Sequence, residues 1–211
     1  MTDAEIAQAL TDGLYAAADQ LLMQATNPWE LDAAMTDFGF PTGVCEGQDD
    51  VGLDAILQRQ NAASRSHEAT FSPILSRMVA EGRLGRKVGV GWYRYPGGGG
   101  LVIDPLVEDL LREEAWFAGV TRVELRDEQM LQRLVAGIVL AALDLMTTGG
   151  SHLTSRVDHL SISALGFPAK TGGALSYART FERLDLVRHL RAVAPDGKGC
   201  AALADALFAI P

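Results

Sequence analysis

The chain has 211 residues, a formal net charge of −9, 48% hydrophobic residues and 21% charged residues. This composition is that of an ordinary folded protein, with enough residues for one large domain or two small ones. The acidic balance argues against nucleic acid as a partner, because phosphate backbones are bound by clustered lysine and arginine. The two cysteines, Cys45 and Cys200, lack Cys-x-x-Cys spacing and are predicted to be free thiols.

The sequence predicts a cytoplasmic protein with no membrane span. Met1–Glu5 is acidic and does not have the basic-then-apolar form of a signal peptide. No apolar run is found to reach the roughly 18 residues that a membrane span needs. The longest apolar pattern, around Leu134–Met146, has the period of an interior helix.

Helix signals run through the first half of the chain. Thr2 and Glu5 form a capping box ahead of apolar residues spaced by three and four. Asn27 and Pro28 are a second start signal, and Gly39 is a stop signal. Four helices are predicted here: from about residue 1, from Pro28 to Gly39, from about Val44 to Gln60, and from Ser72-Pro73 to Gly82.

The stretch from Gly85 to Gly100 is different, because glycines interrupt its β-branched and aromatic residues. We predict a short extended segment near 86–95. Pro96–Gly100 is linker-like and places a boundary between two modules, residues 1–100 and 101–211. Helices are predicted in the second module from Asp104-Pro105 to Gly119, Asp127 to Gly149-Gly150, Arg156 to Ala164, Ala174 to Ala194 with a break, and Cys200 to Phe208. The fold class is therefore predicted to be all-α.

One pattern occurs twice. Asp32 is followed by Phe40-Pro41, and Asp158 is followed by Phe167-Pro168, each after an amphipathic segment. The glycines around both copies are predicted to be turn and helix-stop residues: Gly39, Gly43, Gly166, Gly172 and Gly173. Each aspartate is predicted to accept hydrogen bonds from backbone N–H groups of its turn rather than to act in catalysis.

Three stretches together resemble one family. They are residues 32–54, 78–95 and 158–173. They are similar to the C-terminal region of 3-hydroxyacyl-CoA dehydrogenase, in the duplicated form found in multifunctional fatty-acid β-oxidation proteins. The resemblance implies two tandem related helical modules, 6-phosphogluconate dehydrogenase C-terminal-like in fold. It also implies that these modules cover an acyl-CoA site and form dimer or inter-domain contacts.

The resemblance implies that the redox chemistry lies outside this chain. In the family, a Rossmann domain carries NAD and a catalytic His–Glu pair. The sequence here has no Gly-x-Gly-x-x-Gly ahead of a helix, and no Lys-Ser/Thr follows the glycine run at 97–100. We therefore expect no cofactor to bind this chain alone, whereas NAD is implied for the complete family enzyme.

Some positions depart from the family pattern. Gln8 aligns with the asparagine that holds the substrate oxygen, and Ala141-Ala142 aligns with an Asn-Glu pair of the second half. Gly43-Val44 replaces a Gly-Pro pair. The extra methylene of Gln8 moves its amide, and displacements of about an ångström can cost ~100-fold in rate. No complete set of catalytic residues is therefore predicted.

The one compact basic cluster, Arg83, Arg86 and Lys87, lies beside Trp92 and Tyr93. Two interpretations stay open: the cluster binds CoA phosphates or a partner domain, or it is a solvated group of charges beside core aromatics. No metal site is predicted, because no histidine pair has ligand spacing. The four histidines are His67, His152, His159 and His189.

The sequence is compatible with three functions. The leading hypothesis is a substrate-side and dimerisation module of a 3-hydroxyacyl-CoA dehydrogenase, acting as a homodimer or with a separate NAD-binding domain or subunit. The alternative is a catalytically inactive homodimeric structural protein derived from that module, which the substitutions at Gln8 and Ala141-Ala142 favour. The third, a thioesterase using Cys45, is disfavoured because no histidine partner is evident. Whether the chain alone is an enzyme is left open.

Overall fold

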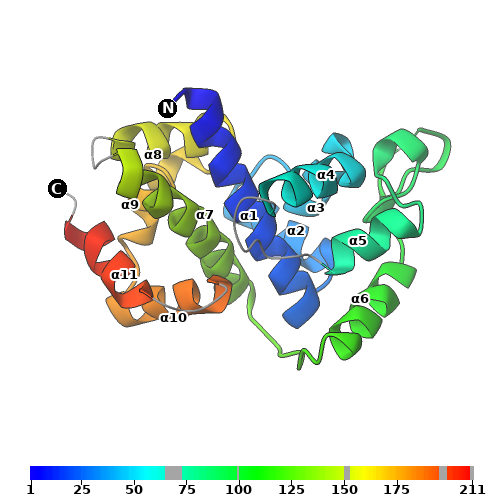
Figure 1. Ribbon diagram of the computed structural model, residues 1–211. Coiled ribbons are helices and arrows are strands. Elements are labelled where there is room, and N and C mark those ends of the chain that lie inside the picture. The colour runs from blue at the N-terminus through cyan, green and yellow to red at the C-terminus, as the bar shows by residue number, and fades with distance from the viewer. Residues whose placement is uncertain (65–72, 99, 150–152, 195–198, 210–211) are drawn as a thin grey trace. The chain divides into compact units, whose positions relative to one another are not determined.

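Figure 1 shows the computed structural model of the protein, which describes residues 1–64, 73–98, 100–149, 153–194 and 199–209. Helices follow one another along almost all of this chain, so the all-α prediction is confirmed. They are α1 (Asp3–Gln24), α2 (Pro28–Phe38), α3 (Val44–Val51), α4 (Leu53–Ser64), α5 (Pro73–Ala80), α6 (Leu106–Phe117), α7 (Asp127–Gly149), α8 (Thr154–Ser163), α9 (Ala174–Ala178), α10 (Arg183–Val193) and α11 (Cys200–Ala209). Single-turn 3₁₀ helices are η1 (Arg86–Val88), η2 (Pro96–Gly98) and η4 (Ala169–Thr171).

The first two helices begin where the sequence predicts. The N–H of Thr2 donates to Glu5 Oε2 at 2.6 Å, and the N–H of Glu5 donates to Thr2 Oγ1 at 3.2 Å, so the capping box is formed. The N–H of Glu30 donates to Asn27 Oδ1 at 2.9 Å, which caps α2. These bonds satisfy N–H groups that have no partner inside the helix.

The prediction of one helix from Val44 to Gln60 was wrong. The chain forms α3 and α4 instead, and they separate at Gly52. Gly52 has φ +98°, a conformation that glycine tolerates and that ends a right-handed helix. The predicted break between Ala174 and Ala194 is confirmed, because α9 and α10 are separate helices there.

The extended segment is shorter than the sequence indicates. Only β1 (Tyr93–Arg94) is a strand within 86–95, and η1 occupies 86–88. β1 pairs antiparallel with β2 (Val102–Ile103), with Tyr93 opposite Ile103 and Arg94 opposite Val102. Ser72 and Gly150, which mark predicted helix ends, lie outside the described residues.

The described chain divides into two compact units. The first unit comprises Met1–Ala17, Asp37–Pro41 and Asp127–Pro211, and the second comprises Ala18–Thr36 and Thr42–Arg126. The division does not fall at Pro96–Gly100. The predicted modules 1–100 and 101–211 stay a prediction, because a repeated module and a compact unit are different properties of a chain.

In the first unit, α7 packs against α9, α10 and α11, and α8 packs against α9. Its core contains a very close backbone approach between α1 and α7. A β carbon added to Gly13 would lie 2.6 Å from the carbonyl oxygen of Gly137, and one added to Gly137 would lie 2.5 Å from that of Gly13. Only glycine permits the helices to come this near at both positions.

The repeated turns also meet in the first unit. The rings of Phe40 and Phe167 are 5.3 Å apart and edge-on. A β carbon on Gly39 would lie 3.4 Å from Pro168, and one on Gly166 would lie 2.8 Å from Pro41. Each turn thus contacts the other through the same kinds of residues.

The second unit is a row of packed helices. α3 packs against α4 and η1, α4 packs against α5, and α5 packs against α6. Trp92, which precedes β1, is fully buried. The Trp92 indole N–H donates to Gln48 Oε1 at 2.6 Å, so the segment between α5 and α6 lies against α3.

α7 is the one candidate for a membrane span among the described residues. Asp127–Thr147 is long and apolar enough by length and composition, and 56% of the apolar window is buried inside the protein. The expectation that no apolar run reaches this length is therefore wrong by length and composition. Core helices satisfy the same test, and α7 packs on three helices of its unit.

Candidate functional site

The carboxylate of Asp32 is bound at the N-terminus of α3. Its Oδ1 accepts the N–H of Cys45 at 2.8 Å, and its Oδ2 accepts the N–H of Glu46 at 2.9 Å. A third donor is the hydroxyl of Tyr93, 2.9 Å from Oδ2. Burial raises the pKa of Asp32 to about 6, although these three hydrogen bonds lower it in part. A β carbon on Gly43 would overlap this carboxylate, which explains the glycine there.

A second carboxylate, Asp49, organises the segment before and through β1. It accepts the N–H groups of Trp92 at 2.9 Å and Tyr93 at 3.0 Å, and the hydroxyl of Tyr95 at 2.8 Å. Burial raises its pKa to about 6, and the same bonds again lower it in part. A β carbon on Gly91 would overlap Asp49, so this glycine admits the carboxylate.

The two tyrosines connect this network. Burial raises the pKa of the Tyr93 hydroxyl and of the Tyr95 hydroxyl, and neighbouring carboxylates raise both further. Both hydroxyls therefore stay protonated and donate. We call these four residues the buried carboxylate network: Asp32, Asp49, Tyr93 and Tyr95. Its hydrogen bonds hold the segment 91–95 against α2 and α3, so the network stabilises the fold.

Asp158 makes a corresponding arrangement in the first unit. Its Oδ1 accepts the N–H groups of Leu175 at 2.8 Å and Ser176 at 3.2 Å, and its Oδ2 accepts the Ser176 hydroxyl at 2.6 Å. Both aspartates of the repeated pattern thus accept backbone N–H groups at the start of a helix. The prediction that they serve their turns is confirmed.

Asp49, Tyr93 and Tyr95 are not predicted from the sequence to be members of one network. Asp49 and its donors are separated by more than 40 residues in the chain, with separations of 43, 44 and 46. The available signal was the placement of Trp92, Tyr93 and Tyr95 in a glycine-rich stretch. Aromatics there need a buried environment, and tyrosine hydroxyls in it need acceptors.

The predicted basic cluster divides between two environments. Arg83 is buried and donates to Asp104 Oδ2 at 2.6 Å and to the carbonyl oxygen of Gly91 at 3.0 Å. Arg86 and Lys87 are exposed. Arg86 pairs with Asp50 at 2.5 Å and Glu46 at 3.1 Å, and its guanidinium lies 4.3 Å from the centre of the Tyr95 ring; Lys87 pairs with Asp54 at 2.5 Å. Their role in substrate binding stays a prediction.

Gln8 and the Ala141-Ala142 pair lie on helices of the first unit. The side-chain amide of Gln8 donates to Asp12 Oδ1, one turn along α1, at 2.9 Å. Ala142 is fully buried, and a β carbon on Gly13 would lie 2.8 Å from the Ala141 β carbon. Ala141 is therefore close to the α1–α7 contact. The carried-over role of Gln8 stays a prediction.

The remaining reactive side chains are poorly placed for chemistry. Cys45 is fully buried, and burial together with Asp32 and Asp49 raises its thiol pKa well above the usual value, which disfavours the nucleophilic thiolate. Burial lowers the pKa of His189. Across the ranges that the structure describes, no group of three or more His, Cys, Asp or Glu side chains could hold a metal ion. His67 and His152 lie outside those ranges.

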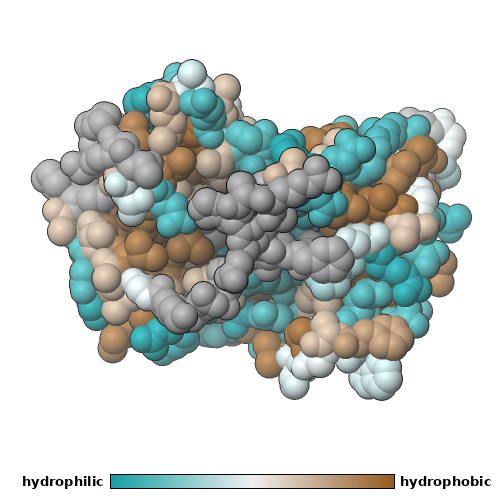
Figure 2. All heavy atoms as spheres, viewed as in Figure 1, coloured by the Kyte–Doolittle hydropathy of each residue, from teal (hydrophilic) through white to brown (hydrophobic). Residues whose placement is uncertain are grey.

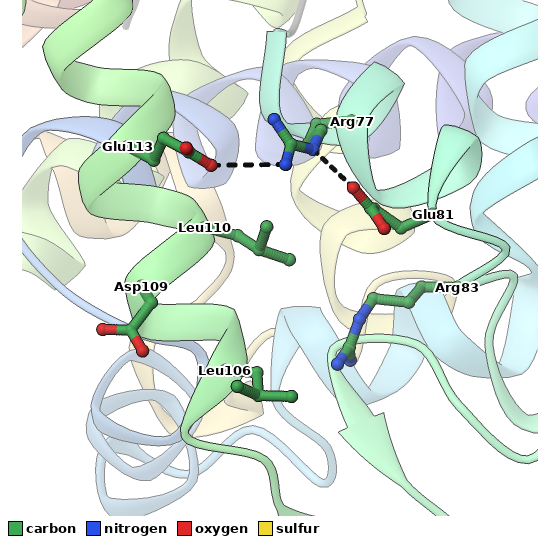
Figure 3. Close-up of a pocket in the computed structure, with 7 residues that line it drawn as sticks. All are labelled: Arg77, Glu81, Arg83, Leu106, Asp109, Leu110 and Glu113. Atoms are coloured by element: carbon green, nitrogen blue, oxygen red, sulfur yellow. Dashed lines mark hydrogen bonds and ion pairs between the residues drawn. The ribbon is translucent and has the colours of Figure 1, made fainter.

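An open cavity of about 460 Å³ lies in the second unit, between α5 and α6 (Figure 3). Its lining residues are Arg77, Glu81, Arg83, Leu106, Asp109, Leu110 and Glu113. Arg77 bridges its two sides, at 2.8 Å from Glu81 and 3.2 Å from Glu113. Among the predicted substrate-binding residues, Arg83 lines this cavity.

These features define a helical domain whose buried polar groups serve its architecture, rather than a nucleotide-binding sheet domain. Residues 6–95 match the family described as 3-hydroxyacyl-CoA dehydrogenase, C-terminal domain. The match contains the whole buried carboxylate network. The sequence resemblance to this family is thereby confirmed.

Curated relatives include a peroxisomal bifunctional enzyme and a peroxisomal fatty acid beta-oxidation multifunctional protein. The chain is 26% identical over 190 residues to the peroxisomal bifunctional enzyme of Danio rerio, covering 80% of this chain and 26% of that protein. It is 30% identical over 158 residues to the peroxisomal fatty acid beta-oxidation multifunctional protein of Oryza sativa subsp. japonica, covering 72% and 22%. The chain thus spans about a quarter of the length of these relatives.

Solved structures show the same fold. The dehydrogenase part of multifunctional enzyme 1 from C. elegans superposes with a TM-score of 0.74 at 20% identity, covering 100% of this chain and 48% of that one. The 3-hydroxybutyryl-CoA dehydrogenase of Escherichia coli K12 superposes with a TM-score of 0.69 at 17% identity, covering 97% and 60%. Likeness at this level of identity establishes the fold alone.

Proposed function

We propose that this chain is the substrate-side and association module of a 3-hydroxyacyl-CoA dehydrogenase of fatty-acid β-oxidation. NAD and the catalytic His–Glu pair are supplied by a separate domain or subunit. The observation that carries this proposal is the family match over residues 6–95. The only sheet in the described ranges is the two-stranded β1–β2 pair, so they offer no parallel sheet edge on which a dinucleotide could lie.

Reciprocal contacts support the internal duplication. A β carbon added to Gly13 would lie 2.8 Å from the β carbon of Ala141. In the same way, one added to Gly137 would lie 2.6 Å from the β carbon of Ala17. An exchange of equivalent partners is the signature of a two-fold interface. Two related modules would then face each other within one chain as two subunits face each other in a dimer. Homodimerisation and a cytoplasmic location are further proposals that rest on the sequence alone.

Domain complementation tests the main proposal. The chain is mixed with a separately expressed nicotinamide-binding domain of a 3-hydroxyacyl-CoA dehydrogenase. Oxidation of NADH by acetoacetyl-CoA reports activity, and light scattering reports complex formation. We expect the chain alone to bind no NADH, and the mixture to form a complex with dehydrogenase activity. If a folded nicotinamide domain gives neither a complex nor a rate, the proposal is wrong.

The role of the basic residues has its own test in that complex. Arg86→Ala is expected to raise the KM for acetoacetyl-CoA several-fold and to leave kcat unchanged, because a phosphate contact far from the reacting carbon contributes to binding in both states. With an acetoacetyl thioester that lacks the nucleotide, the KM of Arg86→Ala should equal that of the parent. Arg112→Ala is the matched control, since Arg112 also pairs with a carboxylate on an exposed helix face, Glu108 at 2.6 Å.

The inactive structural protein remains a second candidate. It is favoured by the side chains themselves, because the amide of Gln8 is bound to Asp12 and all three cations of the predicted cluster are paired with carboxylates. This candidate predicts stable dimers by light scattering and no heat when acetoacetyl-CoA is titrated into the chain. Saturable micromolar binding would rule it out.

A further inference from the structure

Helix α6 has two apolar faces, although a helix at the surface of a domain needs only one. Its inner face, Val107, Leu111 and Ala115, is 0 to 1% exposed. Leu106, Leu110 and Phe117 follow the spacing i, i+4, i+11 and form a second stripe, which we call the outer face of α6; Glu113, paired with Arg77, interrupts it at i+7. Leu106 is 60% exposed and Phe117 is 64% exposed.

Trp116 extends this face. Trp116 is 75% exposed, and its ring packs edge-on against Phe117, with ring centres 5.0 Å apart. Figure 2 shows hydrophobic residues at the surface over this helix, next to hydrophilic ones. Contiguous exposed apolar residues on a protein surface often mark a site of interaction. Tryptophan is enriched among the residues that dominate binding energy at such sites.

The cavity between α5 and α6 adjoins the outer face. In Figure 3, Leu106 and Leu110 point from α6 into the space in front of Glu81 and Arg83. The ion pairs of Arg77 with Glu81 and Glu113 close one end of that space. An open cavity of about 460 Å³ admits the apolar side chains of a partner between a leucine wall and a polar wall.

The charges around the outer face are predominantly negative. Arg83 is neutralised by Asp104. The remaining carboxylates are those of Glu81, Glu108, Asp109, Glu113 and Glu114, and the cations near them are those of Arg77, Arg112 and Arg122. Asp109 is exposed and has no ion-pair partner in the described chain. This excess disfavours a second copy of the same face and an anionic membrane, because like charges would meet.

We propose that the outer face of α6 and the adjoining cavity are a docking site for a basic amphipathic helix of another protein. One apolar side chain of that helix enters the cavity beside Leu106 and Leu110, and others cover Trp116 and Phe117. Its lysine or arginine side chains reach Asp109 and Glu113. This is recognition of a helix by an apolar groove with complementary charge at the rim. The site does not depend on the dehydrogenase assignment.

Two synthetic helical peptides test the proposal on the intact chain. Both carry leucines at i, i+4 and i+7; one has flanking lysines and the other has glutamates at the same positions. The lysine peptide is expected to bind saturably, to shift the emission of Trp116 to the blue, to protect 106–117 from hydrogen exchange, and to bind more weakly as salt rises. Trp116→Phe should remove the emission change and leave the exchange protection in place.

Variants locate the binding. Leu106→Ala with Phe117→Ala should weaken binding about tenfold or more, and Asp109→Lys should also weaken it. The matched controls are Leu184→Ala on α10, where Leu184 is 73% exposed, and Asp37→Lys at an exposed aspartate; both should bind as the parent does. Equal binding of the glutamate peptide, or equal losses in the controls, overturns the proposal. Dimers that Phe117→Ala abolishes would assign the face to a second copy instead.

Discussion

Asp32 and Asp158 perform the same local task with different surroundings. Each accepts two consecutive N–H groups at the start of a helix, at 2.8 and 2.9 Å for Asp32 and at 2.8 and 3.2 Å for Asp158. Each also accepts one hydroxyl. For Asp158 that hydroxyl belongs to Ser176 of the same helix start, whereas for Asp32 it belongs to Tyr93, 61 residues away.

The difference shows how a local capping arrangement becomes a tertiary one. Asp32 is 8% exposed and lies in a network with Asp49, whereas Asp158 is only half-buried. Tyr93 contributes its hydroxyl to Asp32 and its backbone N–H to Asp49, so one residue joins the two carboxylates. The family match contains Asp32 and its network and ends at Tyr95, the last residue of that network; it does not include Asp158. The predictions below measure how far the two arrangements differ.

The largest expected effect is the loss of the Asp32 carboxylate. Asp32→Ala leaves three donors without their acceptor, two of them buried, and should lower the free energy of unfolding by about 3–5 kcal/mol. Asp158→Ala should cost only about 1–2 kcal/mol, because donors near a half-buried site can turn to water. Urea unfolding followed by circular dichroism measures both.

Asp37→Ala is the control for this pair, since Asp37 is exposed at the end of α2. It should change the free energy of unfolding by less than about 0.5 kcal/mol. Equal losses for Asp32→Ala and Asp158→Ala would contradict the comparison, because they would mean that the connection through Tyr93 adds nothing.

A pH dependence comes next in size. The pKa of Asp32 is raised from the ordinary 3.8 to about 6 in the folded protein, so the folded state holds a proton that the unfolded state has released. The resulting stability is fully present below about pH 4 and is lost as pH rises through about 6. A shift of about two units corresponds to about 3 kcal/mol.

Asp32→Asn should therefore flatten the fall of unfolding free energy between pH 4 and pH 6, and Asp49→Asn should do the same because burial raises its pKa to about 6 as well. Chemical unfolding at a series of pH values gives the slopes. Leu53→Ala, a change at a fully buried apolar residue, should lower stability at every pH and keep the slope. A parent-like slope in both asparagine variants would show that the two carboxylates are ionised throughout.

How much the sequence could predict depends on the range of the interactions. The capping box at Thr2 and the cap at Asn27 join residues three apart, and both are formed as predicted. The break at Gly52 was missed, because a glycine inside a helical pattern is tolerated when its φ is negative, and only the fold imposes φ +98°.

The candidate site shows the same limit. That Asp32 and Asp158 serve nearby turns follows from their position before a turn with glycine. That Asp49 holds Trp92, Tyr93 and Tyr95 does not follow, because no local rule fixes which buried acceptor a distant tyrosine meets. The basic cluster was compact in sequence, yet the chain turns Arg83 inward to Asp104 and leaves Arg86 outside.

The smallest expected effect isolates the hydroxyl that distinguishes the two arrangements. Tyr93→Phe removes a buried hydrogen bond to a carboxylate and should cost about 2 kcal/mol, whereas Ser176→Ala should cost about 1 kcal/mol or less. Double-mutant cycles with Asp32→Ala and Asp158→Ala give the coupling of each pair directly. We expect a clearly larger coupling for Asp32 with Tyr93, because water can replace the Ser176 hydroxyl but cannot reach a carboxylate enclosed between α2, α3 and β1. A coupling near zero there would mean that Tyr93 is held by its ring packing and its N–H bond to Asp49, and that the two copies of the turn are energetically alike.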